Sequence, residues 1–131
     1  MKVEVNYREL GILYVSGSRY GVSSSKVFAA LDALWSTGSY REVGVGDACG
    51  VDAWVAAWCA EKGVRCHVWK AYWALYGKSA GVRRSAEMLA DAPADSVLLA
   101  FCCGESRGTR HAVRLAKSFG IPVVLHKIES E

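Results

Sequence analysis

The sequence predicts an α/β fold: a three-layer sandwich with a mainly parallel five-stranded sheet covered by helices on both faces. Two observations predict it. Short apolar runs of strand length alternate with longer segments whose apolar residues recur every three or four positions. Serine, glycine and threonine separate these segments. Because a helical crossover between two strands of one sheet makes those strands parallel, we expect a parallel sheet.

Five apolar runs predict the strands. Each run is short and bounded by turn residues, which is typical of a strand that is buried on both faces. The predicted strands are residues 10–15, 42–46, 64–69, 96–101 and 121–126.

Four segments predict the helices between these strands. In the first, residues 27, 28, 31, 34 and 35 form an apolar stripe after an N-cap among residues 23–25. The second opens at Gly50 and stops at Gly63. The remaining two are expected over residues 80–90 and around residues 112–119, while the aromatic segment 70–79 is expected to be irregular.

Length and composition limit the class of protein. A chain of 131 residues suits one domain spanning 1–131, and 52% hydrophobic residues argue against disorder. Sixteen basic and 13 acidic residues give a net charge of +3, which permits an anionic small molecule and does not favour nucleic acid. No apolar run is long enough to span a bilayer, and residues 1–4 lack a signal-peptide pattern. We therefore expect a cytoplasmic protein without membrane contact.

The cysteines do not predict a disulfide framework or a zinc site. Five are present, an odd number, and no two have CxxC spacing. Cys59 and Cys66 are expected to be small core residues. A nucleophilic Cys102 or Cys103 with His111 as its base is a disfavoured alternative, because only proximity in sequence supports it. We expect no metal and no cofactor.

The first turn that indicates a ligand follows the first predicted strand and reads Ser16-Gly17-Ser18-Arg19-Tyr20-Gly21. Glycine lets backbone N–H groups approach a phosphate closely, and serine hydroxyls add donors. Arginine pairs with phosphate in bidentate fashion. The alternative is an ordinary strand-to-helix turn. Because ligands of open α/β sheets bind beyond the carboxyl ends of the strands, we expect this turn to contact a phosphate.

The second turn follows the second predicted strand and contains Gly46, Asp47, Ala48 and Asp52. It resembles the dinucleotide fingerprint G-x-G-x-x-G, but its last gap is one residue too long, so the signal is weak by itself. The helix N-terminus that follows favours an anion. Asp47 suits a ribose hydroxyl better than a phosphate. Asp52 is either a ligand contact or a charge that stabilises the first helical turn.

The third turn follows the fourth predicted strand and contains Gly104, Ser106, Gly108 and Thr109. It precedes the fourth predicted helix. Its backbone N–H and hydroxyl groups are therefore expected to face a phosphate at the start of that helix.

Together these turns resemble the SLOG superfamily, which includes the Lonely Guy phosphoribohydrolases and the DNA-processing protein DprA. The resemblance is strongest to the small, single-domain YspA-like branch, which carries four motifs in a fixed order. Here those motifs read Ser16-Gly17-Ser18-Arg19, then Gly46-Asp47-Ala48-Cys49-Gly50-Val51-Asp52, then Ala71-Tyr72-Trp73 with Tyr76-Gly77-Lys78-Ser79-Ala80-Gly81-Val82-Arg83-Arg84, and last Cys103-Gly104 with Gly108-Thr109.

The resemblance covers residues 13–124 and implies a Rossmann-like sheet in the strand order 3-2-1-4-5. It also implies a nucleotide-derived ligand and a homodimer or larger homo-oligomer. Trp73 and Lys78 are then expected near the pocket, since segment 70–79 belongs to the third motif. Arg84 matches the arginine of a catalytic motif in the phosphoribohydrolases.

One departure from the family bears on activity. In the phosphoribohydrolases the loop motif P-G-G-x-G-T-x-x-E supplies a glutamate for cleavage of the N-glycosidic bond, and the matching residue here is Ala112. Alanine cannot act as a general base or stabilise an oxocarbenium ion. The chain is therefore expected to lack that activity unless Glu87, Glu105 or Asp47 substitutes.

Three functions are consistent with these residues. The preferred one is a sensor or sequestering protein that binds a nucleotide derivative, such as an ADP-ribose-like molecule or a signalling nucleotide. The second is an enzyme that cleaves the N-glycosidic or phosphate bond of a nucleotide. The third is a DprA-like single-stranded nucleic-acid binder, in which aromatic residues of segment 69–76 would stack on bases. Nucleic acid is disfavoured, because these aromatics also suit a pocket wall or a dimer interface.

Overall fold

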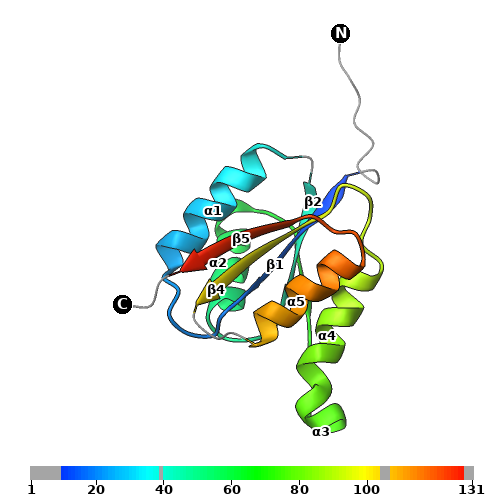
Figure 1. The fold of residues 1–131 in the computed structure, drawn as a ribbon. Coiled ribbons are helices and arrows are strands. Elements are labelled where there is room, and N and C mark those ends of the chain that lie inside the picture. The colour runs from blue at the N-terminus through cyan, green and yellow to red at the C-terminus, as the bar shows by residue number, and fades with distance from the viewer. Residues whose placement is uncertain (1–9, 39, 104–106, 129–131) are drawn as a thin grey trace.

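The computed structural model describes residues 10–38, 40–103 and 107–128. Five strands form one sheet in the order β3-β2-β1-β4-β5, and all of their pairings are parallel (Figure 1). The strands are β1 (Gly11–Gly17), β2 (Tyr40–Gly46), β3 (Cys66–Trp69), β4 (Val97–Cys103) and β5 (Val123–Ile128). The predicted α/β class, the parallel sheet and the strand order are confirmed.

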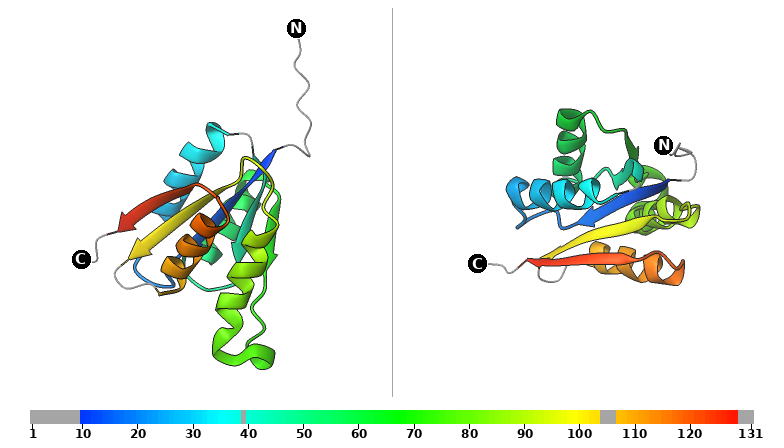
Figure 2. Two further views of the ribbon diagram at one scale, coloured as in Figure 1. Left: turned by 45° about the vertical axis from the view of Figure 1, so that its right-hand side comes forward. Right: turned by 90° about the horizontal axis from the view of Figure 1, so that it is seen from above.

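Helices cover both faces of this sheet, which gives the three layers seen in Figure 2. On one face lie α1 (Ser24–Ser36) and α2 (Val51–Lys62), and on the other lie α4 (Ala80–Ala90) and α5 (Arg107–Ser118). A short helix, α3 (Trp73–Tyr76), and a 3₁₀ turn, η2 (Gly77–Ser79), lead into α4 and project from the body of the molecule (Figures 1 and 2). No helix within the described ranges combines the length and apolar character needed to cross a membrane.

The central strand β1 joins the two halves of the core. Leu13 and Val15 pack into the cluster under α1 and α2, whereas Ile12 and Tyr14 pack into the cluster under α4 and α5. This alternation follows from the two-residue period of a strand. Successive side chains of β1 are therefore buried against opposite helical layers, which explains why residues 12–15 are all apolar.

Two contacts fix the α1–α2 layer. Trp58 is buried on α2, and its Nε1 donates a 2.9 Å hydrogen bond to Asp32 Oδ1 on α1. At the end of β1, a Cβ on Gly17 would lie 2.5 Å from the Val51 side chain. The absence of a side chain at position 17 therefore lets α2 begin directly against the end of β1.

Several predicted boundaries were wrong at the carboxyl ends of strands. β1 continues through Gly17 because its last two residues still pair with Ala100 and Phe101 of β4. β4 in turn continues to Cys103, which pairs with Ile128.

Two predictions for the helices were also wrong. The segment 70–79, expected to be irregular, contains α3 and η2. The fourth helix begins at Arg107, so Gly108 and Thr109 belong to its first turn instead of preceding it.

Candidate functional site

A cavity of about 700 Å³ lies at the carboxyl ends of β1 and β4. Its walls come from the end of β1 and the loop that follows, the first turns of α2 and α5, and the arm formed by α3, η2 and the start of α4. The chain leaves β1 toward one face of the sheet and leaves β4 toward the other. β1 and β4 are therefore the topological switch point of the sheet, where open α/β proteins bind their ligands. We call this cavity the main pocket.

The lining of the main pocket is predominantly cationic. Among the described residues, four basic side chains line it from separate elements, namely Arg19, Lys78, Arg84 and Arg107, against one carboxyl group, that of Asp52. The first turn of α5 adds Gly108 and Thr109 to the lining. The leading N–H groups of a helix have no partner within that helix and carry a partial positive charge. The pocket is therefore arranged to hold an anion.

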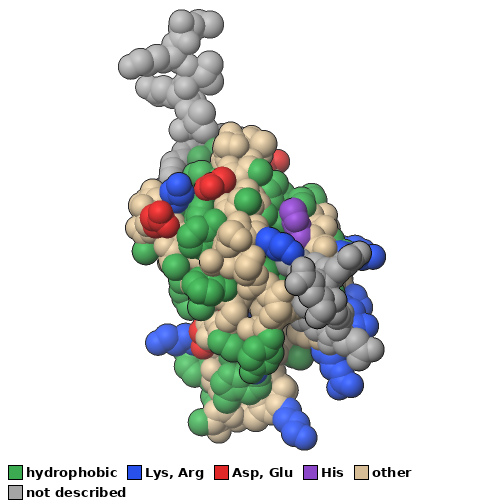
Figure 3. Space-filling view, turned by 90° about the vertical axis from the view of Figure 1, so that its left-hand side faces the viewer, with side chains coloured by type: hydrophobic (Ala, Val, Ile, Leu, Met, Phe, Trp, Pro, Cys, Tyr) green, Lys and Arg blue, Asp and Glu red, His purple; other side chains and the backbone are tan. Residues whose placement is uncertain are grey.

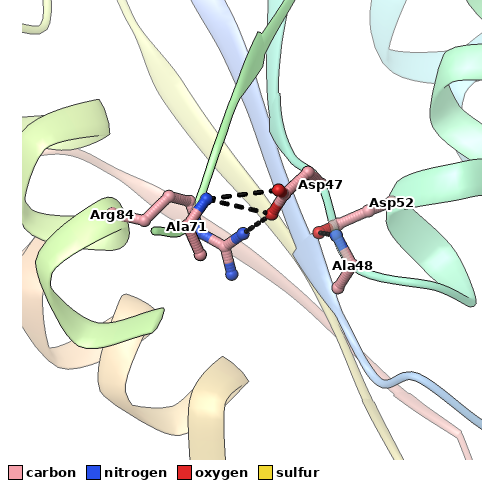
Figure 4. Close-up of polar contacts among 5 residues, drawn as sticks. All are labelled: Asp47, Ala48, Asp52, Ala71 and Arg84. Carbon is pink, nitrogen blue, oxygen red and sulfur yellow. Dashed lines mark hydrogen bonds and ion pairs between the residues drawn. The ribbon is translucent and has the colours of Figure 1, made fainter. Parts of the chain in front are cut away.

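Arg84 is positioned by a contact behind the pocket wall (Figure 4). Its Nη1 lies 2.7 Å from Asp47 Oδ1, and its side chain is only 13% exposed. The same carboxylate accepts a 3.2 Å hydrogen bond from the backbone N–H of Ala71. Asp47, directly after β2, thus contacts both the segment that follows β3, through Ala71, and the helix α4, through Arg84. Asp47 does not line the pocket, so its predicted contact with a ribose stays a prediction.

Asp52 is a buried carboxyl group that faces the main pocket. It is 6% exposed, and its Oδ2 accepts a 3.1 Å hydrogen bond from the backbone N–H of Ala48. Burial raises the pKa of Asp52 to about 6, while the Ala48 hydrogen bond and the charge of Arg84 act in the opposite direction. Asp52 therefore lies in the first turn of α2 and also lines the pocket, and its contact with a ligand stays a prediction.

Gly46 supports the site without lining the pocket. A Cβ at this position would lie 2.6 Å from Arg84 Nη1 and 2.8 Å from Asp52 Oδ2. The missing side chain leaves room for the guanidinium group and the carboxyl group over the end of β2.

Trp73 forms the wall of the pocket that faces solvent. It belongs to α3, is 47% exposed, and its ring lies 5.7 Å from Arg19 Cζ. Gly81 lies under this ring, since a Cβ there would come within 3.4 Å of it. An aromatic face next to a cation at the mouth of an anion pocket is suited to stacking a planar group.

The structure brings most of the predicted site residues together. Eleven of them line the main pocket: Ser16, Gly17, Ser18, Arg19, Ala48, Asp52, Trp73, Lys78, Arg84, Gly108 and Thr109. Gly46 and Asp47 lie behind its wall, and Gly104 and Ser106 lie outside the described residues. The lining residues that the sequence did not single out as ligand contacts are Tyr20, Gly21, Gly81, Val82, Ser85, Arg107 and His111.

The alternative of a nucleophilic Cys102 gains no support from the geometry, and the side chain of Cys103 lies outside the described part of the chain. His111 lines the main pocket, whereas Cys102 lines a different groove on the outer side of α5. Across residues 10–38, 40–103 and 107–128, no group of three or more His, Cys, Asp or Glu side chains is arranged to hold a metal ion.

Comparison with known proteins gives one partial similarity. The chain is 53% identical over 55 residues to the Gene 61 protein of Mycobacterium phage D29. The aligned stretch spans 42% of this chain and 42% of that protein. No protein-family model matches the chain, and no solved structure matches it.

Proposed function

We propose that this protein binds a nucleotide or nucleotide-derived phosphate–ribose ligand, without converting it, as a sensor or sequestering protein. The observation that carries the proposal is the main pocket, in which four cationic side chains and the first turn of α5 converge at the switch point of a parallel sheet. Its volume of about 700 Å³ is in the range of small-molecule sites. Membership of the SLOG superfamily belongs to the same proposal.

The lining suggests how a nucleotide would lie. A phosphate fits best against the first turn of α5, where Arg107 and the backbone of Gly108 supply donors and Arg19 faces it from the turn after β1. The base then lies toward Trp73, whose exposed ring offers a stacking surface.

Mass spectrometry of small molecules released from the purified, denatured protein tests the proposal first. A panel of nucleotides, including AMP, ADP-ribose and cyclic dinucleotides, is then tested for a shift in melting temperature. We expect at least one phosphate-bearing nucleoside to bind and to be recovered unchanged.

A matched pair of variants links binding to the pocket. Arg107→Ala removes a lining cation and should weaken binding at least about tenfold. Arg110→Ala removes a cation one turn along the same helix but outside the pocket, and should leave the affinity unchanged. A panel in which no nucleotide binds the wild type would refute the proposal.

Asp52 favours a second candidate, an enzyme that cleaves the N-glycosidic bond of a nucleotide. A carboxyl group with a pKa near 6 in a cationic pocket is suited to general acid–base catalysis near neutral pH. In such a reaction water adds its oxygen to the ribose carbon and the departing base takes a proton. Release of free base from nucleoside monophosphates, lost in Asp52→Asn, would support this candidate, and unchanged substrate throughout would exclude it.

Self-association is a further part of the proposal. The arm carries exposed apolar side chains, Leu75 and Val82 among them, beside the main pocket. We propose that a homodimer or larger homo-oligomer covers them. Light scattering coupled to gel filtration measures the mass directly, and a monomer at all concentrations would refute this part alone.

A further inference from the structure

A second groove, of about 560 Å³, runs between α5 and the edge strand β5. Four of its lining side chains are cationic: Arg107, Arg110 and Arg114 of α5, and Lys127 of β5. Val113 and Leu125 contribute an apolar floor, and no acidic residue among residues 10–38, 40–103 and 107–128 lines it. We call it the α5–β5 groove. Figure 3 views the molecule from the carboxyl ends of the strands, where the blue basic side chains lie mainly toward one side.

The cations form a row because of helix geometry. Residues 107, 110 and 114 are three and four positions apart, so they lie on one face of α5 at intervals of about 4.5 and 6 Å along its axis. Within the part of the chain that the structure describes, no carboxylate forms an ion pair with any of the four. Among the described residues, this row of positive charge is therefore not neutralised by a carboxylate.

The part of the floor that Leu125 forms is a surface of the sheet that the helices on this face do not cover. β5 is the last strand of the sheet, and α4 and α5 pack over the strands before it. Leu125, in the middle of β5, is 45% exposed although it points to the side of α5. In a larger α/β sheet the next helix of the layer would lie here, parallel to α5 and over this strand.

We propose that the α5–β5 groove docks an acidic amphipathic helix of a partner protein. The apolar stripe of such a helix would cover Val113 and Leu125, and its carboxylates would face the arginine row and Lys127. Single-stranded nucleic acid fits less well, because its binding sites use aromatic side chains to stack bases and the described residues that line this groove include no aromatic one. The proposal is independent of the ligand in the main pocket.

Selection from a displayed library of 16-residue helical peptides tests the proposal. The library is selected on the wild-type protein and counter-selected on an Arg110→Glu/Arg114→Glu variant. These two arginines are chosen because, unlike Arg107, they do not line the main pocket. We expect the enriched peptides to carry aliphatic residues at helical spacing with aspartate or glutamate beside them.

Fluorescence anisotropy of one enriched peptide then measures affinity. Arg110→Glu/Arg114→Glu should weaken binding at least about tenfold, and Leu125→Ser should weaken it without changing charge. Lys26→Glu/Lys70→Glu, a matched reversal of two exposed charges outside both cavities, should change it less than about twofold. Nucleotide binding by Arg110→Glu/Arg114→Glu should equal that of the wild type, which separates this test from that of the proposed function.

Three results would overturn the proposal. The first is a selection that enriches no peptides, or peptides without acidic residues. The second is equal peptide affinity for the wild type and Arg110→Glu/Arg114→Glu, with circular dichroism showing that the variant is folded. The third is tight binding of a fluorescent oligothymidylate that this variant loses while no peptide is enriched, which would assign the groove to nucleic acid.

Discussion

Replacing Asp52 by asparagine should stabilise the protein at neutral pH. Burial raises the pKa of this carboxyl group from 3.8 to about 6. Because the pKa is higher in the folded than in the unfolded chain, the folded state binds the proton more tightly, and stability falls as the pH rises through this interval. Above pH 6 the ionised carboxylate costs about 3 kcal/mol, at about 1.4 kcal/mol for each tenfold change in proton affinity.

Asparagine keeps the shape of Asp52 and an oxygen that can accept the hydrogen bond from Ala48. It loses the attraction to Arg84, so the expected gain at pH 7.5 is between about 1 and 3 kcal/mol. At pH 4 the wild-type carboxyl group is protonated in the folded state, and the difference between the two proteins should nearly vanish.

Urea denaturation of both proteins at pH 4, 5, 6 and 7.5 measures this difference. Glu61→Gln, which neutralises an exposed carboxylate on the same helix, is the control for the loss of one negative charge. If Asp52→Asn and the wild type show parallel pH profiles, burial does not penalise the charge of Asp52 and the reasoning is wrong.

Three further predictions concern packing, each measured as a change in the free energy of unfolding by urea. Gly17→Ala should destabilise by about 1–3 kcal/mol because its Cβ would meet Val51 at 2.5 Å, and Val51→Ala in the same chain should recover part of that loss; equal effects in both backgrounds would contradict the clash. Trp58→Phe should cost about 1–3 kcal/mol, since it removes the hydrogen bond that joins α2 to α1 and leaves a small cavity. Ser96→Ala should cost about 1–2 kcal/mol by leaving the buried N–H of Ile12, now 2.9 Å from Ser96 Oγ, without that partner; an unchanged midpoint would argue against a buried hydrogen bond.

The strands of the sheet could be predicted because the apolar run that indicates each strand lies within that strand. Residues 12–15 of β1 and 97–101 of β4 are apolar on both faces, and glycine-rich and serine-rich breaks separate the strands from the helices. The strand ends were less predictable. Ser16 and Gly17 resemble turn residues in isolation, yet they stay in β1 because β4 offers them ladder partners, which no local pattern reveals.

The main pocket could be predicted in part for a similar reason. Turns that follow parallel strands meet at one edge of the sheet, so Arg19 and Thr109 could be grouped without coordinates. Arg107 stands in the same predicted turn but was not singled out, because its place in the first turn of a helix depends on where α5 begins. The role of Asp47 was also hidden, since its pairing with Arg84 joins residues 37 positions apart.

The arm formed by α3, η2 and the start of α4 was not predicted from the sequence for another reason. Its side chains are mostly exposed, so they lack the apolar periodicity by which a helix is recognised in a sequence. Its position depends on tertiary contacts at its base, above all the hydrogen bond from Ala71 to Asp47.

The arm forms one wall of the main pocket, whereas the turns at the end of the sheet form another part of it. Two of the four cations that line the pocket, Arg19 and Arg107, come from the turn after β1 and the first turn of α5, and these two turns form an anion-binding floor at the end of the sheet. Lys78 belongs to the arm itself. The solvent-side wall, with Trp73, comes from a short excursion of the chain whose two ends meet at the carboxylate of Asp47. Insertions or substitutions within residues 72–79 can therefore change which ligands fit while the anion-binding floor stays the same. Selection for a new ligand would be expected to alter the arm first and the sheet last.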